Sequence, residues 1–309
     1  MPPAPLETVA AGITFQNPLL LAAGTAGYGR EVAQVLDLDA LGGIVTKAVS
    51  VTPRSGAPAP RVAEFDGGMI NAVGLANPGM DEVRGKDLPW LEQNVRRARV
   101  IVNIVGNTTD EFAAVIRKLD DSAAISAYEL NVSCPNVRAG GMEFGADAKS
   151  LTEVVSGARG ATRKPLFVKL SPALPDIART ARVAADAGAD GITVVNTMPG
   201  LVVDVESRRP ALGFGSGGVS GSGLLPVGVL AAYKVAREIS VPVIGAGGIS
   251  RATDIVQYVL AGATLVAVGT SVMQDPKLPA RLIADLRRWL TEHGVASIGE
   301  LRGALEWAH

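Results

Sequence analysis

The sequence predicts an α/β protein that folds as a single (β/α)8 TIM barrel, with insertions after the second and sixth strands. Three observations predict it: eight short apolar runs that end in small or polar residues, helical periodicity between most of them, and a composition that is 48% hydrophobic but only 4% aromatic. Continuous apolar runs alternating with helices are typical of a parallel sheet covered on both faces. Eight such units indicate a closed barrel, and a barrel of about 250 residues with insertions accommodates the chain length. A doubly wound open sheet is the main alternative, and we expect residues 1–309 to form one domain.

Each of the eight apolar runs is expected to be one barrel strand. In chain order they are Pro18–Thr25, Gly43–Ser50, Val100–Gly106, Ala127–Pro135, Pro165–Ser171, Gly191–Thr197, Val241–Gly248 and Thr264–Thr270. Helices are expected where apolar residues recur with helical spacing. These stretches are Glu31–Leu38, Thr109–Leu119, Leu151–Ala161, Pro175–Ala187, Pro226–Ile239, Ala252–Ala261 and Pro276–Leu290.

Two connections are longer than a normal crossover, Val51–Arg99 and Met198–Leu225. Long loops in compact domains are usually functional or disordered. The second is rich in glycine and serine and could be a flexible linker. Because it lies inside the repeating pattern, we interpret it as a barrel insertion.

Composition and charge exclude several classes of protein. A net charge of −1, without a long basic run, gives no field that would attract nucleic acid. The first residues lack a basic start and an apolar core, so no signal peptide is expected, and the apolar runs are too short to span a bilayer. A single cysteine excludes an internal disulfide framework and any multi-cysteine zinc or iron–sulfur site in this chain. We therefore expect a cytoplasmic protein that acts on a small molecule, with no metal site.

The most informative residue is that cysteine, Cys134, at the end of the fourth expected strand. A lone cysteine is commonly a small apolar core residue. Here Pro135 stops the strand, polar residues flank the thiol, and the Gly-rich segment 138–141 follows and could act as a lid. Because barrel enzymes carry their reactive groups at strand ends, this context favours a thiol that transfers protons.

Other polar residues close neighbouring strands. Lys47 and Lys169 each end an apolar strand, and two such lysines favour an anion-binding or flavin-tuning role over simple exposure of the ammonium groups to solvent. Asn103, Asn131 and Asn196 close three further strands. Amides are costly to bury unpaired, so several together indicate a planar polar ligand such as a pyrimidine or an isoalloxazine ring, although each alone could be a turn residue.

Glycines close the last two strands, at Gly247-Gly248 and at Gly269 before Thr270. Backbone amides at these positions form the usual phosphate site of a barrel, so a phosphate-bearing cofactor is expected. Three alternatives follow from the residues. The chain could be a flavin dehydrogenase, an isomerase or aldolase with Lys169 as a Schiff-base lysine, or a non-catalytic binding barrel in which Cys134 is structural.

Motifs in the same order along the chain resemble the class 1 dihydroorotate dehydrogenases, and specifically the catalytic subunits of class 1B. The motifs are Asn17-Pro18, Ala23-Gly24-Thr25, Lys47-Ala48, Pro60-Arg61-Val62, Asn71-Ala72-Val73-Gly74-Leu75, Asn77-Pro78-Gly79, Asn131-Val132-Ser133-Cys134-Pro135-Asn136, Val168-Lys169-Leu170-Ser171-Pro172, Asn196-Thr197, Gly217-Gly218-Val219-Ser220-Gly221, Gly247-Gly248 and Gly269-Thr270. The resemblance implies a barrel that binds one FMN and oxidises (S)-dihydroorotate to orotate in de novo pyrimidine biosynthesis.

The resemblance also implies residue roles. Cys134 is the base that removes the C5 proton while the hydride at C6 passes to flavin N5, and Lys169 stabilises negative charge on the reduced flavin. The implied substrate-binding residues are Lys47, Asn71, Ala72, Val73, Gly74, Leu75, Asn131, Asn196 and Thr197. The implied FMN-binding residues are Ala23, Gly24, Lys47, Ala48, Asn103, Asn131, Lys169, Val195, Gly221, Gly247, Gly248, Gly269 and Thr270.

One departure concerns Ala23, where the family commonly has serine, so that a hydroxyl contact to FMN is lost there. The class 2 features, a serine base and an N-terminal extension, are not found in this sequence. Class 1B resemblance implies a homodimer whose partner subunits hold FAD and a [2Fe–2S] cluster and reduce NAD. One cysteine cannot hold that cluster in this chain.

Overall fold

The computed structural model describes residues 6–133 and 144–307. Eight parallel strands close into a barrel in the order β10-β15-β16-β3-β4-β7-β8-β9. They are β3 (Leu19–Leu21), β4 (Gly43–Val45), β7 (Arg99–Ile104), β8 (Ile125–Asn131), β9 (Leu166–Leu170), β10 (Gly191–Val194), β15 (Val243–Ala246) and β16 (Leu265–Val268). Each lies within or overlaps one of the eight expected runs. The closed barrel is confirmed and the open doubly wound sheet is wrong.

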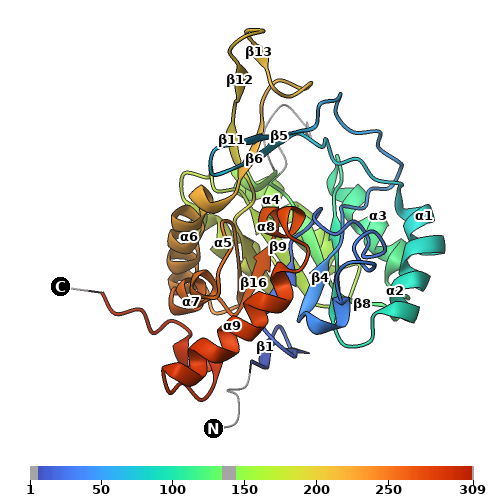
Figure 1. The fold of residues 1–309 in the computed structure, drawn as a ribbon. Helices are drawn as coiled ribbons and strands as arrows, with labels where there is room; N and C mark the ends of the chain where they lie inside the picture. Colours follow the sequence, from blue (N-terminus) through green and yellow to red (C-terminus); the bar gives the residue numbers. More distant parts are fainter. Residues whose placement is uncertain (1–5, 134–143, 308–309) are drawn as a thin grey trace.

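Helices cover the outside of the barrel (Figure 1). They are α3 (Thr109–Leu119), α4 (Ala148–Arg159), α5 (Ile177–Asp186), α6 (Leu225–Glu238), α7 (Ala252–Leu260), α8 (Thr270–Gln274) and α9 (Leu278–Glu292), with short 3-10 turns η3 (Phe144–Ala146) and η5 (Ile298–Leu301). Helix α3 shows why they form: Thr108 accepts a hydrogen bond from the backbone N–H of Glu111, and Phe112, Val115 and Ile116 face the core.

The expected helix at Glu31–Leu38 is wrong. The chain there forms turns that end in the 3-10 turn η1 (Leu38–Ala40). The Asp37 side chain accepts the backbone N–H of Asp39, which caps η1, and Glu31 accepts the backbone N–H of Tyr28. These local bonds from side chain to backbone compete with a continuous helix.

The two long connections meet over one end of the barrel. The first contains β5 (Val62–Phe65), β6 (Gly68–Asn71), α1 (Met80–Glu82), the π-helical turn η2 (Val83–Asp87) and α2 (Leu88–Asn94); the second contains β11 (Met198–Gly200), β12 (Val203–Asp204), β13 (Arg209–Pro210), β14 (Gly217–Ser220) and the 3-10 turn η4 (Ser222–Leu224). Strands of both form a four-stranded sheet in the order β11-β14-β6-β5. We call it the roof sheet, and Figure 1 shows it above the barrel, with β12 and β13 projecting beyond it. The Gly/Ser-rich segment is therefore part of this sheet, and the linker alternative is wrong.

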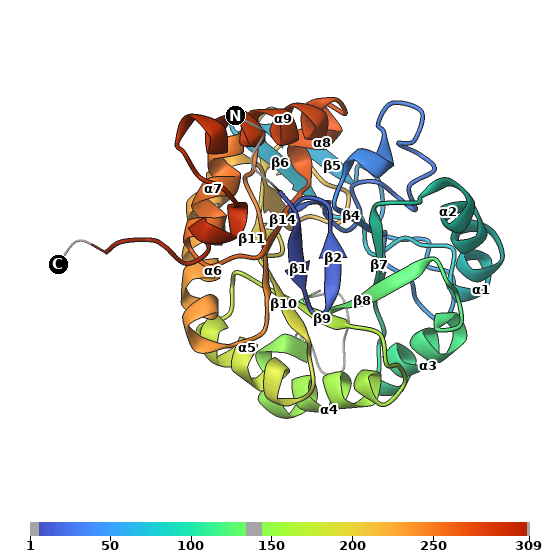
Figure 2. The same cartoon turned by 90° about the horizontal axis from the view of Figure 1, so that it is seen from below.

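A hairpin of β1 (Thr8–Ala10) and β2 (Ile13–Phe15) crosses the opposite end of the barrel (Figure 2). Phe15 is fully buried and packs with inward-facing residues of the strands, among them Leu20 and Phe167. It closes the amino-terminal end of the barrel interior, as the roof sheet covers the other.

Replacing Phe15 with Ala should lower the free energy of unfolding by about 3 to 5 kcal/mol, because the change removes a fully buried aromatic side chain and leaves a cavity. Urea unfolding monitored by circular dichroism measures it. Val9→Ala, in the same hairpin but 57% exposed, is the matched control and should change the stability by less than about 0.5 kcal/mol. Equal losses in the two variants would contradict this role of Phe15.

Candidate active site

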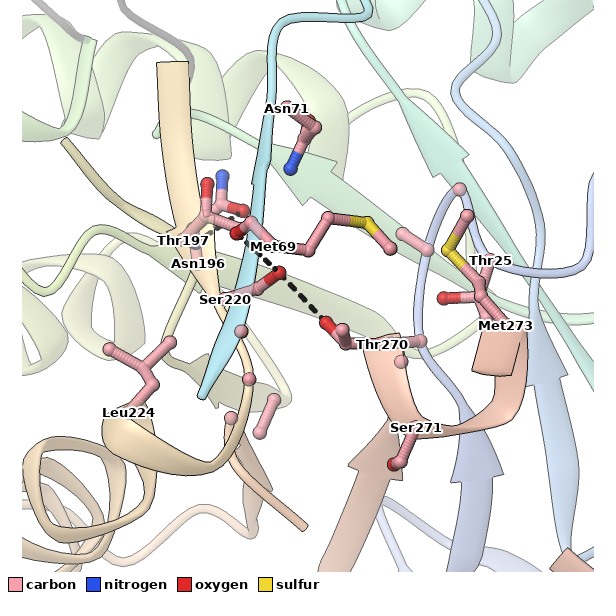
Figure 3. A pocket seen from close by; sticks show the side chains of 18 of the residues that line it. Thr25, Met69, Asn71, Asn196, Thr197, Ser220, Leu224, Thr270, Ser271 and Met273 are labelled. Carbon is pink, nitrogen blue, oxygen red and sulfur yellow. Dashed lines mark hydrogen bonds between the residues drawn. The ribbon is translucent and has the colours of Figure 1, made fainter. Parts of the chain in front are cut away.

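A cavity of about 690 Å³ lies between the carboxyl ends of the barrel strands and the roof sheet. Its floor is built by residues at or just after the strand ends, because closure of a parallel barrel brings all eight carboxyl ends to one rim. Its cover includes Met69 of β6 and Ser220 of β14 (Figure 3). Both the location and the size are typical of a small-molecule site.

The structure places all but one of the predicted site residues around this cavity. The residues that line it are Ala23, Gly24, Lys47, Ala48, Asn71, Ala72, Val73, Gly74, Leu75, Asn103, Asn131, Lys169, Val195, Asn196, Thr197, Gly221, Gly247, Gly248, Gly269 and Thr270. The exception is Cys134, which lies outside the described residues, as does the predicted lid segment at 138–141. Residues from all eight strand ends and both insertions thus meet in one place.

Two lysines supply positive charge to the cavity. Lys169, on β9, is only 7% exposed, and Lys47, which follows β4, is half-buried. Among the ion pairs of residues 6–133 and 144–307, neither lysine takes part. Burying a charge without a counter-charge is costly. An anionic ligand would offset that cost.

A serine orients two of the cavity asparagines. Ser133 donates its hydroxyl to Oδ1 of Asn131 at 3.0 Å and accepts a hydrogen bond from Nδ2 of Asn196 at 2.7 Å. Oδ1 of Asn196 accepts the backbone N–H of Thr197 at 2.9 Å. On the other side, Asn71 Nδ2 donates to the carbonyl of Gly218 in the roof sheet at 3.2 Å. The asparagines are therefore held in fixed orientations, as a site that recognises a planar polar ring requires.

Glycines form the rim of the cavity beside β15 and β16. Gly248 has a φ of +76°, and a Cβ there would lie 2.3 Å from the backbone nitrogen of Leu225. The neighbouring Gly247 is held through its carbonyl, which accepts the Tyr258 hydroxyl at 2.8 Å. Burial raises the pKa of Tyr258 well above its ordinary value, so this hydroxyl remains a donor. This rim presents backbone to the cavity with no side chain in the way, which suits a phosphate group.

The roof sheet, the 3-10 turn η4 and helix α8 supply cavity residues that sequence reasoning missed. Additional lining residues include Val62, Glu64, Phe65, Met69, Ser220, Ser222, Ser271 and Met273. Thr270 donates to the Ser220 hydroxyl at 2.7 Å, so α8 is tied directly to β14 (Figure 3). A sequence signal for part of this set existed, because Asp66-Gly67 between β-prone residues is a hairpin pattern.

The described residues carry neither a cluster of metal-ligating side chains nor a helix suited to a membrane. Residues 6–133 and 144–307 contain no group of three or more His, Cys, Asp or Glu side chains that could hold a metal ion. None of the helices in this part of the chain is both long and apolar enough to cross a membrane.

Comparison with known proteins agrees with this geometry. The family model described as "Dihydroorotate dehydrogenase" matches residues 5–290. The chain belongs to the dihydroorotate dehydrogenase family. This is the family whose motifs the sequence resembles.

Similar proteins in this family cover the chain almost completely. The "Dihydroorotate dehydrogenase B (NAD(+)), catalytic subunit" of Geobacter sulfurreducens is 44% identical over 97% of this chain and 98% of its own length. The protein of the same name from Pelobacter propionicus is also 44% identical, over 96% and 97%. A solved structure of DHODH from Eimeria tenella, in complex with ferulenol, has a TM-score of 0.82 and 24% identity over 97% of this chain and 88% of that one. At that identity, the last comparison shows the fold alone.

Members of the dihydroorotate dehydrogenase family depend on FMN. The cavity fits this cofactor in three respects: a rim of glycine backbone for a phosphate, two lysines without carboxylate partners among the described residues, and a buried amide oxygen of Asn103 with no hydrogen-bond partner there. Asn103 lines the cavity although it is fully buried.

Replacing Gly248 with Ala should weaken FMN binding by at least about tenfold, because the new Cβ would collide with the Leu225 backbone and force the rim to move. Titration of the apoprotein with FMN, followed by quenching of flavin fluorescence, measures the affinity. Gly67→Ala is the control, because it also has a positive φ and lines the cavity, but a Cβ there meets nothing within 4 Å. Equal losses of affinity in both variants would show that backbone strain, and not the collision, is responsible.

Proposed function

We propose that this chain is the class 1B catalytic subunit that oxidises (S)-dihydroorotate to orotate in de novo pyrimidine biosynthesis, with one bound FMN. The observation that carries the proposal is the convergence of Lys47, Lys169 and the oriented asparagines with a glycine rim in one cavity of a dihydroorotate dehydrogenase family member. Membership of this family favours the dehydrogenase over the isomerase, aldolase and non-catalytic alternatives. We also propose that residues 1–309 form one FMN-binding domain.

Substrate binding is assigned to the side of the cavity that carries the amides and Lys47. Dihydroorotate has a carboxylate and a ring with two amide N–H groups and two carbonyls. Lys47 pairs with the carboxylate, and the segment from Asn71 to Leu75 with Asn131, Asn196 and Thr197 holds the carboxylate and the ring. Both donors and acceptors are available there, because an asparagine amide offers each.

Cofactor binding is assigned to the strand-end residues on the floor and the rim. The proposed FMN contacts are Ala23, Gly24, Lys47, Ala48, Asn103, Asn131, Lys169, Val195, Gly221, Gly247, Gly248, Gly269 and Thr270. The absence of a hydroxyl at Ala23 leaves only backbone groups for the cofactor at that position.

Proton transfer is assigned to Cys134, which directly follows the serine that orients Asn131 and Asn196. The thiolate accepts the proton from C5 of the substrate, and a thiol near its ordinary pKa must be tuned toward the working pH to do so. Bound FMN would supply the acceptor for the hydride that leaves C6. The Lys169 ammonium, which takes part in none of the ion pairs of the described residues, stabilises negative charge in the cavity.

The proposed assembly follows from the NAD(+) catalytic subunits that the chain resembles. We propose a homodimer that recruits two electron-transfer subunits, each holding FAD and a [2Fe–2S] cluster, to form a heterotetramer with NAD as final acceptor. Similarity to proteins named catalytic subunits supports a second kind of subunit. We propose a cytoplasmic location, which suits a chain with one cysteine.

Replacing Cys134 with Ala should leave FMN bound and slow dihydroorotate oxidation by about 10² to 10⁴, because positioned proton transfer is worth about that much. Stopped-flow reduction of the bound flavin by dihydroorotate measures it. Cys134→Ser, which keeps a weaker proton acceptor, should retain more activity at high pH than at neutral pH. Wild-type rates in the alanine variant would remove Cys134 from this role.

Replacing Lys47 with Ala should weaken orotate binding by about tenfold to a hundredfold, because a hydrogen bond to a charged group is lost. The shift of the flavin spectrum on orotate addition gives the affinity. Lys234→Ala, an exposed position on α6 that does not line the cavity, is the matched control and should bind orotate normally. Normal orotate affinity without Lys47 would mean that another group holds the anion.

A further inference from the structure

An acidic side chain lies inside the barrel directly beneath the cavity floor. Glu129, on β8, is 1% exposed and accepts two hydrogen bonds of 2.7 Å. One comes from Nδ2 of Asn103 on β7, and the other from the hydroxyl of Thr193 on β10. Neither the substrate-binding nor the cofactor-binding assignment uses Glu129, so its burial calls for an explanation.

The carboxylate dictates which way the Asn103 amide points. A carboxylate only accepts hydrogen bonds, so the amide must turn its NH2 group toward Glu129 and its oxygen away. The backbone of Asn103 is satisfied elsewhere: its N–H donates to the Thr46 hydroxyl at 3.2 Å, and its carbonyl accepts from Val49 N at 2.9 Å. Within the described residues, Oδ1 of Asn103 is thus a buried acceptor without a partner, on a residue that lines the cavity.

We propose that Glu129 is a positioning residue, which holds the Asn103 carbonyl oxygen toward the cavity as an acceptor for the ring N–H of the oxidised flavin. The inference rests on the proposed FMN function. Oxidised flavin carries a single ring N–H, and it requires an acceptor. If the Asn103 amide were reversed, its NH2 group would face that N–H and two donors would oppose each other. Glu129 therefore acts through Asn103 and does not touch the cofactor.

Glu129→Gln tests the assignment with almost no change in shape. Thr193 can keep donating its hydroxyl to the glutamine oxygen, which leaves the glutamine NH2 group to face Asn103. That NH2 group then donates to Asn103 Oδ1, which satisfies this oxygen internally and reverses the amide. FMN affinity of the apoprotein should then fall by about tenfold or more, while the melting temperature of the apoprotein stays within a few degrees. Thr193→Val is the matched control: it removes the other hydrogen bond to Glu129 but leaves the amide orientation intact, so FMN affinity should stay within about twofold.

A double-mutant cycle distinguishes an effect of Glu129 that acts through Asn103 from a general disturbance of the FMN site. In an Asn103→Ala background, Glu129→Gln should cause no further loss of FMN affinity, because the amide that Glu129 orients is gone. Wild-type FMN affinity in Glu129→Gln would overturn the assignment. So would a double variant whose loss of FMN affinity equals the product of the two single losses. A wild-type apoprotein that does not bind FMN would instead overturn the proposed function, and this inference with it.

Discussion

Closure of eight parallel strands into one barrel is the constraint on which the site depends. The strands run in one direction, so side chains at Lys47, Asn131 and Lys169, far apart in the sequence, meet at the same rim. The interior below them is packed with Phe15 and its neighbours, as in the filled core of other TIM barrels. The functional groups are consequently held on rigid strand ends, while the insertions complete the cover.

The floor of the cavity concentrates polar groups that folding alone leaves unsatisfied. Lys169 is buried without an ion pair among the described residues, and Oδ1 of Asn103 lacks a partner there. Burial of each group lowers the stability of the apoprotein, and a ligand that pairs with it offsets that loss. Ligand binding is therefore expected to raise the free energy of unfolding. Ser133 and Glu129 have a different effect from these unsatisfied groups. Ser133 donates to the amide oxygen of Asn131, and Glu129 accepts from the amide NH2 group of Asn103. Each bond satisfies one side of an amide and so fixes what the other side can bind.

Strand ends could be predicted from the sequence because apolar runs and the polar residues that close them are local patterns. Gly247-Gly248 and Lys169 were visible in this way, and both line the cavity. The roof sheet could not be predicted, since the pairing of Gly218 with Asn71 joins two insertions and depends on tertiary geometry. The role of Glu129 was not predicted, because the residue lies inside an apolar run. A charged residue in a strand expected to be buried does, however, indicate a specific polar partner. The role of Cys134 rests on the motif that contains it, since the thiol lies outside the described residues.

The central claim is that one cavity brings a flavin and dihydroorotate together. The most direct measurement is to add dihydroorotate to the purified chain without oxygen and follow the visible absorbance of the flavin. The account predicts a yellow protein whose absorbance bleaches as the flavin is reduced. A yellow protein that stays yellow would contradict the substrate assignment, and a colourless chain that cannot be reconstituted with FMN would contradict the flavin site itself.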